Sequence, residues 1–90
     1  MIPGKDELER IFLEMCKYDT TNPPGNEESL ALYIKETLES YGIGSTIQRV
    51  DVGRVNLLAK IDRNGRLPFL LFTGHMDVVP AASGWTSEPF

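Results

Sequence analysis

The chain has 90 residues and a formal net charge of −4 at pH 7. Hydrophobic residues make up 41% of it and charged residues 24%, which is typical of soluble globular proteins. This length allows one domain at most, and the acidic balance argues against a nucleic-acid partner because no basic stripe is available to neutralise phosphates. No apolar run approaches the roughly 20 residues that span a bilayer, and the N-terminus lacks the pattern of a signal peptide. We therefore expect a cytoplasmic protein that has no membrane partner.

Two helices are expected in the first half of the chain. Apolar residues at positions 8, 11, 12 and 15 repeat at the spacing of one helix face. Residues 20–25 contain two prolines and a glycine and cannot continue that helix. Asn26 is a good N-cap and two glutamates follow it, so a second helix is predicted over 27–41, ended by Gly42.

Three strands are expected after the second helix. Residues 46–52 are rich in β-branched side chains, and residues 55–61 alternate between core-facing and solvent-facing types, with a turn between the two segments. After a second turn at 62–65, the nearly unbroken apolar run 67–72 is typical of a strand that is covered on both faces. The sequence therefore predicts an α/β fold in which two helices pack on a mixed sheet, with the third strand central and paired to the second.

Two polar side chains, His75 and Asp77, follow the third expected strand after a glycine that lets the backbone turn. Ligands of open α/β sheets bind beyond the carboxyl ends of the strands, so position alone makes both residues site candidates. Imidazole is a common zinc ligand, and a carboxylate two residues away can accept a hydrogen bond from its other ring nitrogen. A metal site needs three or four ligands, however, and the chain offers one histidine. The residues by themselves therefore leave two interpretations open: His75 has a structural role, or it belongs to half of a metal site.

A longer pattern surrounds these two residues. The segment 70–80, which reads LLFTGHMDVVP, is followed by Gly84-Trp85 and Pro89-Phe90, and it closely resembles the first signature of the M20 metallopeptidase family. The upstream segments 21–27 and 54–57 also resemble the N-terminus of that family. The family includes acetylornithine deacetylases, succinyl-diaminopimelate desuccinylases and aminoacylases. The resemblance implies that residues 1–90 are the start of a zinc-exopeptidase-like catalytic domain, and that the remainder and a lid or dimerisation domain are absent.

The resemblance also implies roles for the two candidate residues. His75 would be a ligand of one ion in a two-zinc site, where cobalt or manganese could replace zinc, and Asp77 would be the catalytic residue that orients it. The implied reaction is metal-assisted hydrolysis of the amide bond of a small N-acyl amino acid or short peptide. In the family the other ligands and the general base lie downstream of the position of Phe90, so the 90 residues alone are expected to be inactive.

Two other interpretations stay open on the sequence. The chain could be a non-catalytic α/β interaction module, or a short homologue that self-associates as a homo-oligomer through an exposed sheet edge. Asn22 and the prolines after it are interpreted either as a plain loop or as a loop that is shaped to lie near the mouth of a site. The arginines at 49, 54, 63 and 66 are predicted to be surface charges near a hairpin.

Overall fold

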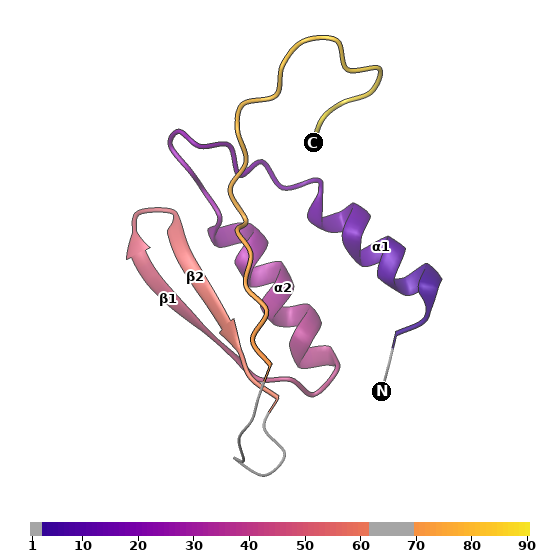
Figure 1. Ribbon diagram of the computed structural model, residues 1–90, viewed down its shortest axis with the longest axis vertical. Helices are drawn as coiled ribbons and strands as arrows, with labels where there is room; N and C mark the ends of the chain where they lie inside the picture. The colour runs from indigo at the N-terminus through magenta and orange to yellow at the C-terminus, as the bar shows by residue number, and fades with distance from the viewer. Residues whose placement is uncertain (1–2, 62–69) are drawn as a thin grey trace.

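The computed structural model describes residues 3–61 and 70–90 and contains two helices and one hairpin in these segments (Figure 1). The element order is α1 (Lys5–Met15), α2 (Glu28–Ser40), β1 (Ser45–Asp51) and β2 (Arg54–Ala59). The two predicted helices and the first two predicted strands are confirmed. The residue directly before α2 is Glu27, in helical conformation and without a side-chain cap hydrogen bond, so the expected N-cap role of Asn26 is wrong.

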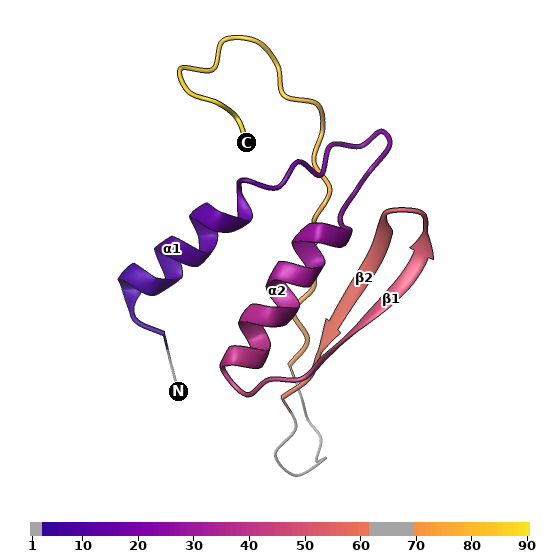
Figure 2. The same ribbon diagram turned by 180° about the vertical axis from the view of Figure 1, so that it is seen from behind.

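The helix α2 is the middle layer of the fold. It contacts both strands of the antiparallel hairpin on one side and α1 on the other, as the two opposite views show (Figures 1 and 2). Strand pairing runs from Ser45↔Ala59 to Arg49↔Val55, and an irregularity between Arg49 and Asp51 brings Asp51 opposite Arg54. The hairpin turn is tied to the start of α2, because the Glu27 backbone N–H donates to the Gly53 carbonyl at 2.9 Å.

The buried apolar core of the described residues is small. It consists of Leu30 and Ala31 from α2 and Val55 from β2, and it lies where the helix crosses the hairpin. A core of this size leaves little reserve of stability, because short chains bury a small fraction of their surface. Single contacts at the start of α2 therefore matter more here than they would in a larger domain.

We expect Leu30→Ala to lower the free energy of unfolding by about 2–3 kcal/mol, through lost apolar burial and the cavity that remains. The matched control is Leu32→Ala on the same helix, because Leu32 is 44% exposed and Leu30 only 6%. The control should cost well under about 1 kcal/mol. Urea denaturation followed by circular dichroism measures both values. Equal losses at the two positions would contradict the packing described here.

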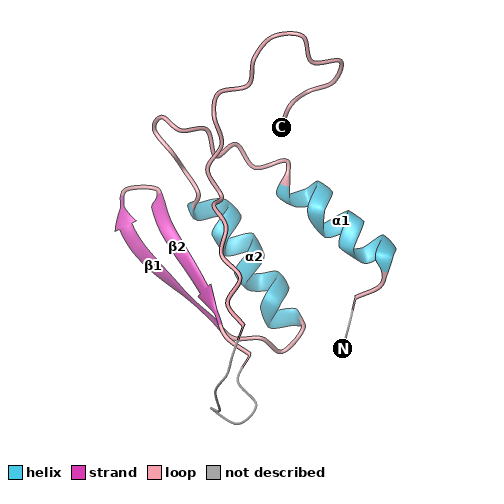
Figure 3. Cartoon of the chain, viewed as in Figure 1, coloured by secondary structure: helices cyan, strands magenta, loops and turns pink. Residues whose placement is uncertain are grey.

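The predicted third strand is wrong where the structure describes it. Leu70, Leu71 and Phe72 are irregular, exposed and paired with no strand (Figure 3). The predicted turn at 62–65 and the beginning of the predicted strand lie outside the described residues. Within the described residues the sheet is therefore a two-stranded antiparallel hairpin, and the predicted mixed sheet with a central third strand is not formed. A central strand needs paired neighbours and a layer on each face. The two helices and the hairpin leave Leu70, Leu71 and Phe72 exposed.

One parallel bridge, Thr21↔Val78, joins the loop after α1 to the C-terminal segment. The Asn22 backbone N–H donates to the Val78 carbonyl at 2.8 Å, and the Val78 N–H donates to the Thr20 carbonyl at 3.1 Å. These bonds bring residues that are far apart in sequence to one place, and this place is where the candidate site lies. None of the described helices is long and apolar enough to cross a membrane.

Candidate functional site

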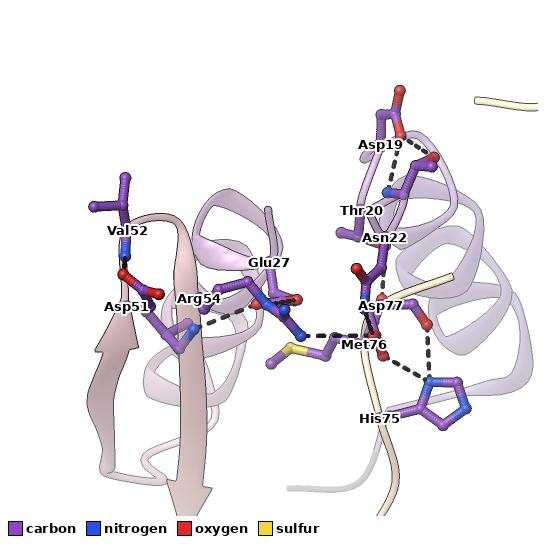
Figure 4. A network of polar contacts seen from close by, with 12 residues as sticks. Asp19, Thr20, Asn22, Glu27, Asp51, Val52, Arg54, His75, Met76 and Asp77 are labelled. Carbon is purple, nitrogen blue, oxygen red and sulfur yellow. Dashed lines mark hydrogen bonds and ion pairs between the residues drawn. The ribbon is translucent and has the colours of Figure 1, made fainter. Parts of the chain in front are cut away.

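The candidate site is built on two loop segments, 20–22 and 75–78, that the parallel bridge holds side by side. The Thr20 side chain is 2% exposed, and its hydroxyl donates to the Met76 carbonyl at 2.6 Å. A buried hydroxyl that satisfies a main-chain carbonyl fixes the backbone at that point. The Asn22 side chain and the His75 ring both lie next to Asp77 (Figure 4).

The orientation of the His75 ring follows from its contacts with Asp77. The ring Nδ1 lies 2.8 Å from the Asp77 main-chain oxygen and 3.2 Å from the carboxylate Oδ1. Both oxygens can only accept, so Nδ1 carries the proton and donates it. In the neutral ring this leaves the lone pair on Nε2. The side chain is 84% exposed, so Nε2 is accessible to a ligand.

The Asp77 carboxylate is held by three neighbours. Its Oδ2 accepts a hydrogen bond from the Asn22 amide at 2.9 Å and lies 3.6 Å from the Arg54 Nη2. The Asn22 hydrogen bond, together with the charges of His75 and Arg54, lowers the pKa of Asp77 below its usual value, against a smaller opposing effect of burial. An ionised carboxylate is a pure acceptor and therefore suits the task of holding a ring N–H.

Behind Asp77 lies an ion pair that joins the hairpin to the start of α2. The Arg54 Nε is 2.7 Å from the Oε1 of Glu27, a residue that is only 3% exposed. The N–H does not point at that oxygen closely enough to form a hydrogen bond, so the contact is an ion pair. Arg54 lies at the start of hairpin strand β2 and its side chain is 37% exposed, as expected of a surface charge near a hairpin, and its guanidinium also lies between two carboxylates.

A cavity of about 390 Å³ opens at this place and is lined by Asn22, His75, Asp77, Val78 and Val79. A second cavity of about 880 Å³ separates segment 73–77 from β2, and Arg54 and Asp77 lie on its wall. Asn22 therefore lines a cavity at the candidate site, which favours the interpretation of its loop as one that lies near the mouth of a site.

The side chains that are present fit one metal ligand and not a whole metal site. Residues 3–61 and 70–90 contain no group of three or more His, Cys, Asp or Glu side chains that could hold an ion. His75 offers one accessible ring nitrogen, and the carboxylate of Asp77 already serves Asn22, Arg54 and His75. This donor set agrees with half a site, to be completed by ligands from elsewhere.

Three curated proteins show what the chain is similar to. It is 39% identical over 89 residues to a Staphylococcus aureus protein named a probable succinyl-diaminopimelate desuccinylase, covering 97% of this chain and 21% of that protein. A Staphylococcus epidermidis protein with the same name is 37% identical over 83 residues, 90% of this chain and 20% of its own length. A Pyrococcus abyssi protein, provisionally named a LysW-lysine/LysW-ornithine hydrolase, is 36% identical over 76 residues, 84% of this chain and 20% of its length.

The chain is homologous to the N-terminal part of M20-family hydrolases. The predicted resemblance is therefore confirmed, and the small α/β unit described above corresponds to the start of M20 enzymes. The chain spans about one fifth of the length of these curated relatives. No family model matches the chain, and no solved structure matches it.

The sequence singled out His75 and Asp77 as site candidates and Asn22 as part of a loop near a site mouth, but it did not predict how Asn22, Glu27 and Arg54 are arranged around Asp77. His75 and Asp77 stand two positions apart, so their contact can be predicted from spacing. Asn22 contacts Asp77 across 55 positions, and one sequence carries no signal of that pairing. Glu27 and Arg54 are likewise remote, and each by itself looks like an ordinary surface charge.

Proposed function

We propose that this chain supplies the first part of the active site of a metal-dependent M20 hydrolase that cleaves an amide bond of an N-acylated amino acid. In this proposal His75 is a metal ligand and Asp77 is the residue that orients it. The observation that carries the proposal is the ring geometry of His75. Its Nδ1 faces both acceptor oxygens of Asp77, which leaves the lone pair of Nε2 exposed beside a cavity.

The chain's own residues would act by positioning and charge. Asp77 holds the Nδ1 proton, which makes Nε2 a better electron donor and fixes the plane of the ring. Asn22 fixes the Asp77 carboxylate at 2.9 Å from the opposite side. When bound, a divalent ion supplies Lewis acidity, which lowers the pKa of water and polarises a carbonyl. Zinc is the expected ion, and cobalt or manganese could replace it, because one histidine does not identify the metal.

The proposed substrate class comes from the relatives. A desuccinylase removes a succinyl group from an amine, so N-succinyl-diaminopimelate is the first substrate to test. The choice of acyl group and amino acid depends on residues outside this chain in a protein of the relatives' length.

A chimera tests the proposal directly. Residues 1–90 would replace the matching N-terminal segment of the Staphylococcus aureus relative, and release of succinate would be measured with added zinc. We expect the chimera to hydrolyse the substrate, and the 90-residue chain alone to show no turnover above background, because it offers one metal ligand of the three or four that are needed.

Two controls make the result decisive. The unmodified relative establishes that the assay detects the reaction, and circular dichroism establishes that the chimera is folded. A folded but inactive chimera beside an active relative would contradict the proposed function and favour a non-catalytic interaction module. Turnover by the 90-residue chain alone would contradict the claim that its site is incomplete.

A further inference from the structure

Arg54, the first residue of β2, lies between two carboxylates that come from opposite ends of the chain. Its Nε is 2.7 Å from Glu27 Oε1, and its Nη2 is 3.6 Å from Asp77 Oδ2. Figure 4 shows the guanidinium between the Glu27 side chain, at the start of α2, and the segment that carries Asp77 and His75. The planar guanidinium presents donors in a fixed fork, so one arginine can face two carboxylates at once.

The Glu27 side of this bridge is anchored. The carboxylate of Glu27, a residue that is 3% exposed, is costly to leave without a partner. Among residues 3–61 and 70–90, its contacts are the Arg54 guanidinium and one long hydrogen bond from the Val55 N–H at 3.4 Å. The main chain of Glu27 is also fixed, through its bond to the Gly53 carbonyl. The guanidinium therefore cannot swing into solvent without stranding a buried negative charge.

A glycine lets the guanidinium lie this close to the loop. Gly25 has φ +79°, and a Cβ built on it would lie 2.6 Å from Arg54 Nε and 2.7 Å from Cζ. Any other residue at this position would push against the guanidinium group. The backbone of the loop after α1 and the buried carboxylate therefore define the position of Arg54 from two directions.

The Asp77 side of the bridge leads to His75. Oδ2 faces Arg54 and the Asn22 amide, and Oδ1 lies 3.2 Å from the His75 Nδ1. Rotation of the carboxylate away from His75 would break both contacts on Oδ2. The orientation of the imidazole ring is thus coupled, through Asp77, to a buried ion pair in the interior of the fold.

We propose that Arg54 is a positioning residue, held by buried Glu27, that fixes the Asp77 carboxylate and thereby the tautomer and orientation of His75. The inference rests on the proposed function for its biological meaning, because a fixed His75 ring matters only if that ring binds an ion. The contacts themselves need no metal and no substrate, so the inference can be tested on the 90-residue chain.

The chain has one histidine, so long-range proton–nitrogen NMR spectra of the labelled chain report a single imidazole. The ratio of its Nδ1–H to Nε2–H tautomers would be measured at about pH 8.5, where an ordinary imidazole is neutral. Two variants remove the bridge. Arg54→Lys keeps the charge but loses the fork, and the double variant Glu27→Gln/Arg54→Met leaves no buried charge unpaired. Circular dichroism checks that both are folded.

The matched control is Arg49→Met. Arg49 also joins the hairpin to the start of α2, through two 2.6 Å hydrogen bonds to Glu28, but within the described residues it forms neither a hydrogen bond nor an ion pair with Asp77. We expect both Arg54 variants to lower the tautomer ratio by about threefold, the size of one partly screened ion pair, and the control to leave it unchanged. An unchanged ratio in folded Arg54 variants, or an equal change in the control, would overturn the inference.

The NMR test of Arg54 and the chimera test of the proposed function can give independent outcomes. An inactive chimera with an Arg54-dependent tautomer ratio would defeat the proposed function and leave the positioning role of Arg54 intact. An active chimera with a tautomer ratio that is independent of Arg54 would defeat the positioning role alone.

Discussion

In the active chimera, His75→Ala is expected to lower kcat/KM for the succinylated substrate by more than the roughly 100-fold that loss of an outer-shell partner costs. The Nδ1 of His75 faces Asp77, so its Nε2 is the nitrogen that we propose as the metal ligand. Alanine removes it without disturbing the buried core, because the side chain is 84% exposed. Initial rates over a range of substrate and zinc concentrations measure the effect.

Two further variants give losses of activity with which the loss in His75→Ala can be compared. Asp77→Asn should reduce kcat/KM by about 10–100-fold, because the ring keeps its metal-binding nitrogen but loses the ionised acceptor that orients it. Glu39→Gln, on the last turn of α2, removes an exposed carboxylate paired with Lys35 and should change neither rate nor metal dependence. Retention of activity in His75→Ala would show that His75 is not a ligand. A larger loss from Asp77→Asn than from His75→Ala would reverse the assigned roles.

The second large effect is expected at Gly25. Alanine there must adopt φ near +79°, and its Cβ would lie against the Arg54 guanidinium at 2.6 Å. Backbone strain of this kind costs about 1–3 kcal/mol. Displacing Arg54 from a buried carboxylate adds to that cost, so we expect a loss of about 3 kcal/mol or more in the free energy of unfolding.

A second glycine provides the matched control. Gly42, after α2, has φ +78°, and a Cβ added to it would meet no atom within 4 Å, so Gly42→Ala imposes the same backbone strain without the clash. The difference between the two variants in urea denaturation therefore isolates the cost of moving Arg54. Equal losses would show that the guanidinium can shift freely, which would also weaken its assigned positioning role.

Local patterns were enough to predict the helices, the hairpin and the pair of candidate residues. Helix α2 is recognisable because its apolar residues repeat at helical spacing and a glycine follows its end. The β1–β2 hairpin is recognisable because two strand-like segments flank a short turn. His75 and Asp77 could be paired because they stand only two positions apart in the chain. In each case the physical cause acts over a few neighbouring residues, so its pattern can be recognised in a single sequence.

The third predicted strand shows the limit of such patterns. The run that ends at Phe72 is apolar enough for a central strand, but a strand exists only where a neighbour pairs with it and layers cover it. Those partners are not encoded in the run itself. Self-association through an open sheet edge stays a prediction for the same reason, since it depends on surfaces and not on a local pattern.

The resemblance to M20 hydrolases, the two helices, the hairpin and the choice of His75 as a candidate ligand could all be predicted from the amino-acid sequence. The surroundings of His75 became visible in the folded chain. The Thr21↔Val78 bridge, the Asn22–Asp77 hydrogen bond and the Glu27–Arg54–Asp77 bridge each join distant segments. Ion pairs and hydrogen bonds depend on distances of a few ångströms, and only the folded chain brings such remote residues that close.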